Sequence, residues 1–131
     1  MKSLLSILHH PVLGYHVLRL SIAAMMLLHG IAKLGKGVDG IQGMLTAHGL
    51  PAFVAYGVFI GELVAPLLVL ANLWVGPAAL VMAINMLFAI GLVHMHQIFT
   101  LGPAGGWGIE TQGLFLLGSM ALALLAPARR G

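Results

Sequence analysis

Long apolar segments, separated by short polar or glycine-rich stretches, make up most of this chain. A helix needs about 20 mainly apolar residues to cross the hydrocarbon core of a bilayer. Four segments approach or exceed that length, so the pattern predicts an all-α integral membrane protein folded as a four-helix bundle. The expected spans are residues 12–34, 51–73, 75–94 and 109–126.

Two longer connections follow the first and third expected spans. The connection at 35–50 is expected to hold a short helix, because Asp39 with Gln42 three residues later is typical of a helix start and Gly49 of a helix end. This helix is too short to span, so we expect it to lie at the membrane surface. Glycines and a proline surround Trp107 in the other connection, which predicts a break in the helix and an aromatic ring at interface depth.

Composition and charge support a membrane protein of one domain, residues 1–131. Hydrophobic residues make up 60% of the chain and charged residues 7%, whereas a soluble domain carries roughly a quarter charged residues. The apolar surface is therefore expected to face lipid. Lys2, Arg129 and Arg130 mark the two termini while the turn at 72–77 is uncharged, so the positive-inside rule predicts that both termini are cytoplasmic.

Several classes of chemistry are excluded or disfavoured. The chain has no cysteine, so redox work through its own thiols is excluded and would need a bound cofactor or a partner. Its six basic residues are scattered, so no nucleic-acid partner is expected. No phosphate loop, haem motif or helical His-x-x-x-His pair occurs, and His94 and His96 are two residues apart and point to nearly opposite sides of a helix. We therefore expect no nucleotide, haem or metal.

Two ionisable side chains are expected inside the hydrocarbon layer. Arg19 shares a face of the first span with Gly30 and Lys33, and this face should point into the bundle. An arginine at bilayer depth costs at least ~2.5–3.5 kcal/mol on insertion scales, so it needs an anion or water, unless its stem snorkels to the boundary. Glu62, near the centre of the second span, is the expected partner. Such a pair would either lock two helices together or line a ligand pocket.

Polar backbone and side-chain groups are expected beside Glu62. Pro66, four residues later, cannot donate the hydrogen bond that the Glu62 carbonyl would normally accept, which predicts a kink and a free acceptor. Asn85 lies at the middle of the third span, where an interhelical hydrogen bond is its simplest role. Polar atoms are thus expected to converge at the middle of the membrane.

A second polar cluster is expected at the ends of the spans on the side away from the termini. Glu110 at the start of the last span also complements the helix dipole, which is the ordinary reason for an acid there. Lys33 can likewise be explained by snorkelling at the interface. Both explanations stay open. The residues of this expected cluster are His29, Lys33, His94, His96 and Glu110.

Short motifs occur along the chain in a fixed order. They are Arg19 in the first span, HG-x-x-K at His29 to Lys33, GLP at Gly49 to Pro51, Glu62 in the second span, a histidine ending the third, and GGW followed by Glu110. In this order and spacing the chain resembles the DoxX family of small bacterial membrane proteins over nearly its whole length. The resemblance implies a four-helix protein of the bacterial inner membrane, related to the small subunit of thiosulfate:quinone oxidoreductase and to membrane components of other oxidoreductase or stress-response systems.

Two functions are compatible with these residues. In the first, the chain is the membrane subunit of an oxidoreductase system and binds a quinone or similar lipid-soluble ring. Glu62 or Glu110 would handle a proton, and Arg19, Lys33 or a histidine would stabilise the developing oxyanion. A partner subunit would supply electrons. The further residues expected at the ligand are His29, His94, Asn85 and Trp107.

In the second, the bundle is a non-enzymatic membrane anchor, assembly factor or small carrier whose intramembrane charges are structural pairs. Four spans without a clear inverted repeat disfavour a full transporter unless the chain forms a homo-oligomer. The two functions differ in one structural feature: Glu62 and Arg19 either line an accessible cavity or pack in a dry seam.

Overall fold

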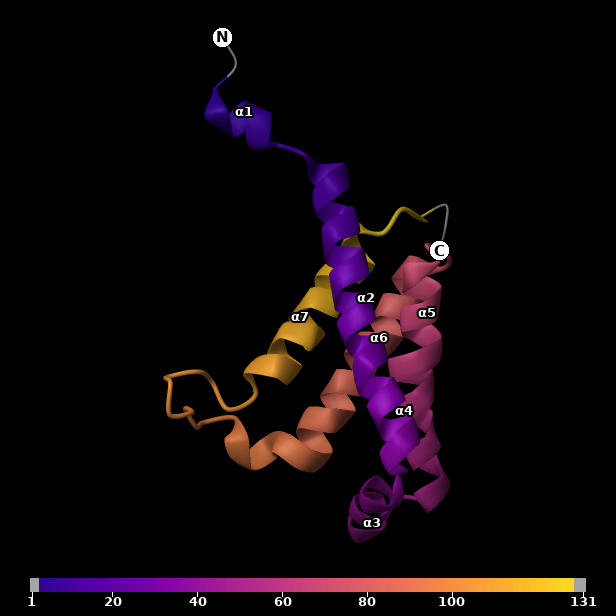
Figure 1. Ribbon diagram of the computed structural model, residues 1–131. Helices are drawn as coiled ribbons and strands as arrows, with labels where there is room; N and C mark the ends of the chain where they lie inside the picture. The colour runs from indigo at the N-terminus through magenta and orange to yellow at the C-terminus, as the bar shows by residue number, and fades with distance from the viewer. Residues whose placement is uncertain (1–2, 129–131) are drawn as a thin grey trace.

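The computed structural model describes residues 3–128, and most of them are helical (Figure 1). The first and second spans are helices, α2 and the continuous helix η1–α4–η2–α5, and the short α3 lies between them. The third span is α6 with η3, and the fourth is α7. The bounds are α1 Leu4–Leu8, α2 Pro11–Lys36, α3 Asp39–Ala47, η1 Ala52–Tyr56, α4 Gly57–Phe59, η2 Ile60–Val64, α5 Ala65–Leu70, α6 Val75–Ala89, η3 Ile90–His94, η4 Met95–Gln97 and α7 Glu110–Leu125.

The helical membrane bundle predicted from the sequence is confirmed. Three helices, Pro11–Lys36, Ala52–Leu70 and Val75–Leu92, are long and apolar enough to cross a membrane, and Glu110–Leu125 is a shorter apolar helix. With 16 residues, α7 is about 24 Å long against a hydrocarbon core of about 30 Å. The loop before α7 must therefore lie close to the apolar layer if α7 crosses it.

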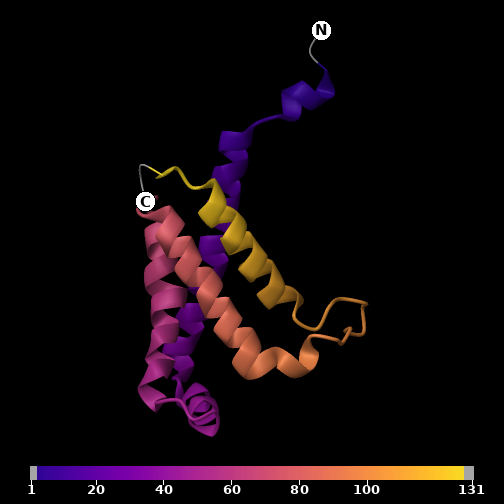
Figure 2. The same ribbon diagram turned by 180° about the vertical axis from the view of Figure 1, so that it is seen from behind.

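The ends of the bundle differ in what they carry. The start of α2, the end of α7 and the α5–α6 turn lie together at one end, and α3 and the loop before α7 lie at the other (Figures 1 and 2). This is the arrangement expected for four antiparallel spans. The charges from which a cytoplasmic location of the termini was predicted, Lys2, Arg129 and Arg130, lie outside the described residues, so that orientation stays a prediction.

Small side chains and methionines fill the main core, where α2, α5, α6 and α7 meet. Small residues let helix backbones approach closely in a bilayer, and unbranched methionine fills the irregular gaps between them. Large apolar side chains elsewhere on the helices are exposed, as expected for a surface in contact with lipid. The buried members of this core are Ile22, Ala23, Met26, Ala65, Val69, Val75, Ala78, Ala79, Met82, Met86, Phe115 and Leu122.

The short helix α3 ends as predicted but begins differently. Gly49 has φ +77°, and the backbone N–H groups of Leu50 and Gly49 donate to the carbonyls of Leu45 and Thr46 at 2.8 and 3.0 Å, which is the Schellman termination. The predicted N-cap at Asp39 is wrong, because Val38 occupies the cap and no side chain bonds to it. Asp39 instead sits in the first turn, where its charge complements the helix dipole.

The second spanning helix changes its winding at Glu62. Residues Ile60–Val64 form a π-helical turn, in which the Ala65 N–H reaches back to the Ile60 carbonyl. Pro66 follows, and it has no N–H to donate to the Glu62 carbonyl. The kink and the free acceptor stay predictions. Gly30 of α2 lies directly against this carbonyl, and a Cβ on Gly30 would overlap the oxygen and come within 2.8 Å of the Glu62 carbonyl carbon. The absence of a side chain at Gly30 therefore fixes how closely α2 approaches the π turn.

Gly30→Ala should destabilise the bundle by about 1–3 kcal/mol, the usual cost of overpacking a core. Gly14→Ala in the same helix is the matched control, because a Cβ at Gly14 meets nothing within 4 Å. Unfolding of the detergent-solubilised protein by SDS, followed by far-UV circular dichroism, measures both. Equal losses in the two variants would contradict the close approach at Gly30.

Candidate ligand-binding site

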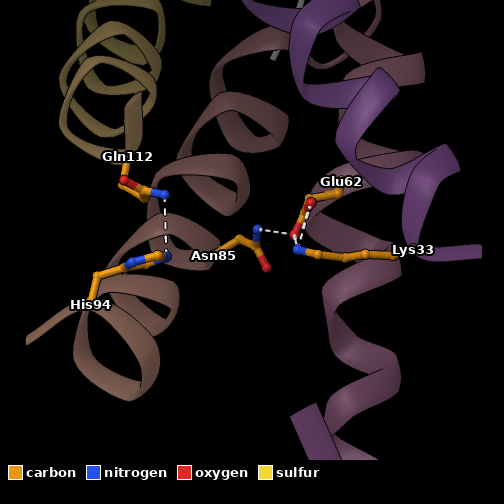
Figure 3. Close-up of polar contacts among 5 residues, drawn as sticks. All are labelled: Lys33, Glu62, Asn85, His94 and Gln112. Atoms are coloured by element: carbon orange, nitrogen blue, oxygen red, sulfur yellow. Dashed lines mark hydrogen bonds and ion pairs between the residues drawn. The ribbon is translucent and has the colours of Figure 1, made fainter. Parts of the chain in front are cut away.

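A partly buried ion pair joins the first and second spanning helices. The Lys33 ammonium donates to both carboxylate oxygens of Glu62, at 2.6 Å to Oε2 and 2.9 Å to Oε1 (Figure 3). The Glu62 side chain is 1% exposed and the Lys33 side chain 32%. Removing a carboxylate from water costs several kcal/mol unless a cation and hydrogen bonds compensate it. Lys33 supplies that compensation.

The third spanning helix completes the group. Asn85 donates from Nδ2 to Glu62 Oε2 at 3.0 Å, so the carboxylate receives hydrogen bonds from two different helices. Gly61 makes this possible, since a Cβ there would come within 2.5 Å of Asn85 Cβ. The interhelical hydrogen bond expected of Asn85 is thereby confirmed. Lys33, Glu62 and Asn85 are called the polar triad below.

The predicted Arg19–Glu62 pair is wrong. Arg19 precedes Gly30, which faces Glu62, by 11 residues of α2, or about 16 Å along a helix, beyond the reach of its side chain. Its Nη1 donates instead to the carbonyls of Val69 and Leu70, at 2.7 and 2.9 Å. Both carbonyls lie in the last turn of α5, at the negative end of its dipole.

His16 lies on α2 about one turn before Arg19. Arg19 Nε donates to His16 Nδ1 at 3.2 Å, and Arg19 is 7% exposed. Arg19 is thus buried, and it is compensated by backbone carbonyls and an imidazole. Through these hydrogen bonds Arg19 joins α2 to the end of α5.

A cavity of about 240 Å³ lies beside the polar triad. Its walls come from α3, from η1–α4–η2 and from α6, and they are mainly apolar, with the polar triad as the charged or amide-bearing group of the lining. Arg19 lies outside it. The lining residues are Lys33, Ile41, Met44, Leu45, Val54, Ala55, Gly57, Val58, Gly61, Glu62, Val81, Ile84, Asn85, Phe88, Ala89 and Leu92.

Among the described residues, the members of the expected second cluster form no hydrogen bond or ion pair with one another. Lys33 is held by Glu62. His94 is half-buried in η3, and its Nδ1 is 2.7 Å from Gln97 Oε1. Its Nε2 is 3.2 Å from Gln112 Nε2 (Figure 3). These contacts suit a neutral ring that donates from Nδ1 and accepts at Nε2. His96 is exposed, so His94 is the histidine that faces its neighbours.

The other predicted residues lie at the surface near α7. His29 is exposed and places its ring edge-on to Phe115, with centroids 5.4 Å apart. Glu110 is exposed in the first turn of α7. The Trp107 indole donates to the Ile98 carbonyl and helps to close the loop before α7. None of these three residues lines the cavity at the polar triad. Their contacts with a ligand stay predictions.

Three features of the site were missed in the sequence. The partnership of Lys33 with Glu62, the closeness of Gly61 to Asn85 and the glutamines around His94 all depend on contacts between distant segments. One signal was available: Gly30 and Lys33 lie three residues apart on one face, so a helix that packs on Gly30 also comes within reach of Lys33. Among residues 3–128, no three histidine or acidic side chains gather closely enough to hold a metal ion.

The fold and the site together define a helical membrane protein with the polar triad beside a mainly apolar cavity. Comparison with family models identifies the family: the DoxX model matches residues 14–95, more than half of the chain, and the protein belongs to the DoxX family. The matched range contains the whole polar triad and ends before α7. No curated protein and no solved structure matches the chain. That residues 1–131 form a single domain stays a prediction.

Lys33→Met should cost about 3 kcal/mol of stability, because it leaves a buried carboxylate without its cation. The partial exposure of Lys33 places this estimate at the low end of losses from broken buried pairs. Lys33→Met combined with Glu62→Met should recover most of the loss, since two apolar side chains replace both charges.

Lys36→Met is the control for these variants, because Lys36 is exposed one turn further along α2 and should change stability by less than about 0.5 kcal/mol. The free energy of unfolding in detergent, measured for the single and double variants, gives the coupling. A double variant as unstable as the sum of the two single variants would show that Lys33 and Glu62 act independently.

Proposed function

We propose that this protein binds a quinone or a similar lipid-soluble ring in the cavity beside the polar triad, as the membrane subunit of an oxidoreductase system. The observation that carries the proposal is the combination of a mainly apolar cavity with a lysine, a carboxylate and an amide in its lining. Ligand sites characteristically pair apolar walls with a few convergent polar groups.

The residues suit a quinone in size and in chemistry. Drug-sized ligands occupy pockets of about 300–1,000 Å³, so a cavity of about 240 Å³ fits a ring rather than a larger cofactor. The faces of a ring need apolar walls, and its carbonyl oxygens need hydrogen-bond donors. Lys33 and Asn85 carry the donors, and the partial exposure of the Lys33 side chain leaves part of it accessible to a ligand.

Each member of the polar triad has a role in this proposal. Lys33 places a positive charge where a carbonyl oxygen becomes negative, which stabilises that oxygen in a site that excludes water. Glu62 holds or delivers a proton at its carboxylate. Asn85 orients Glu62 through its hydrogen bond. A bound quinone would supply the capacity to accept two electrons together with two protons.

The cationic role expected of Arg19 passes to Lys33 in this proposal, because Arg19 is engaged by α5 carbonyls. Glu110 is left out because it lies outside the cavity. Since the chain has no cysteine, we propose that a partner subunit delivers the electrons. We also place the protein in the bacterial inner membrane with both termini cytoplasmic, in keeping with the charge pattern of the chain.

The protein purified in mild detergent should carry a quinone, detectable by mass spectrometry and ultraviolet absorption. Glu62→Gln should lower its occupancy about tenfold or more, because it removes the charge that orders Lys33 and Asn85. Glu110→Gln is the matched control and should retain the quinone.

Two results would overturn the proposal. One is a wild-type protein that neither retains a quinone nor binds an added short-chain quinone, which would favour an anchor, assembly factor or carrier. The other is loss of the quinone in Glu110→Gln but not in Glu62→Gln, which would move the site to α7.

A further inference from the structure

We infer that the cavity is entered sideways from the bilayer, through an opening between η1 and α6, and that its ligand keeps an apolar tail in the lipid. The nature of the ring at the polar triad rests on the proposed function. The opening itself rests on the exposure and the depth of the residues that line the cavity.

The lining residues divide into a closed side and an open side. Leu45, Ala55 and Glu62 are each 1% exposed and form the inner wall. Six other lining residues are exposed, and none of them has a polar side chain. They are Met44 (38%), Val54 (37%), Val81 (36%), Ile84 (44%) and Phe88 (55%), together with Gly57. They mark the mouth of the cavity.

On α6, the mouth lies near the middle of the third spanning helix. α6 and η3 have 15 and 5 residues, about 30 Å of helix, which matches the hydrocarbon thickness. Val81 follows the start of α6 by six residues and Phe88 precedes the end of η3 by six residues, so each lies about 9 Å from an end of this helix. A side opening at that depth faces acyl chains.

The route from the nearer aqueous side is covered by α3. Ile41, Met44 and Leu45 of α3 line the cavity, and Leu45 packs with Val38 and Ala55 in a small apolar cluster separate from the main core. A polar solute would have to pass this cluster or cross the lipid to reach Glu62. A molecule with an apolar tail is already dissolved in the bilayer at the depth of the mouth.

The position of the opening can be tested without any ligand. Because the chain lacks cysteine, Val58→Cys carries a single nitroxide label inside the cavity. In lipid vesicles its collision rate with oxygen, which dissolves in lipid, should exceed that with a water-soluble nickel chelate by about tenfold or more. A larger rate with the nickel chelate would place the entrance on the aqueous side, and low rates with both would show a closed cavity; either result overturns the inference.

Whether the tail of the ligand leaves through this mouth can be tested with variants of α6. Ile84→Trp narrows the mouth and should weaken binding of a long-tailed isoprenoid quinone about tenfold more than it weakens binding of a tail-less quinone ring. Leu87→Trp is the control, because Leu87 is exposed on α6 outside the cavity lining, and it should bind both ligands like the wild type. Equal binding of the tailed quinone by both variants would exclude this mouth as the exit of the tail.

The two tests separate the opening from the proposed function. If the label collides mainly with oxygen but the protein binds no quinone, the lateral opening is supported and quinone is excluded as the ligand. If the protein binds quinone in a way that depends on Glu62 but the label collides mainly with the nickel chelate, the proposed function is supported and the lateral entrance is excluded.

Discussion

The carboxylate of Glu62 is the constraint around which this bundle is arranged. It is 1% exposed in a chain whose outer surface faces lipid, so it must be compensated from within the protein. Lys33 and Asn85 can do this only because Gly30 and Gly61 let the first and third spanning helices come close to the π-helical turn. Compensation of the Glu62 charge therefore depends on the close packing of the three helices.

The first spanning helix separates two tasks along its length. At one end, the Arg19 guanidinium donates to two carbonyls in the last turn of α5, which fastens α2 to the second spanning helix. Toward the other end, Lys33 neutralises Glu62 beside the cavity. Both are intramembrane cations with long stems, but Arg19 is engaged by backbone and Lys33 remains partly accessible. This difference distinguishes a structural cation from a candidate ligand-binding one.

The helices could be predicted from the sequence because a span is a local property of length and composition, and Gly49 likewise ends α3 through local backbone geometry. The partner of Glu62 could not be predicted in this way. It depends on the axial offset between two helices, which the contact of Gly30 with the Glu62 carbonyl sets. The predicted pairing with Arg19 was wrong because periodicity gives the face of a helix but not this offset. His94 and Gln112 meet for a similar reason, across a loop that periodicity does not describe.

The order of the partners along the chain has a consequence for biogenesis. Lys33 precedes Glu62 by 29 residues and Arg19 precedes Val69 by 50, so a ribosome delivers both cations of α2 before the groups that neutralise them. A cation alone at the centre of a spanning helix costs ~2.5–3.5 kcal/mol on insertion scales, and less where its stem can snorkel to the interface. The first helix therefore gains a stable place in the membrane only when the second arrives, which makes the helical hairpin, rather than the single helix, the unit of insertion.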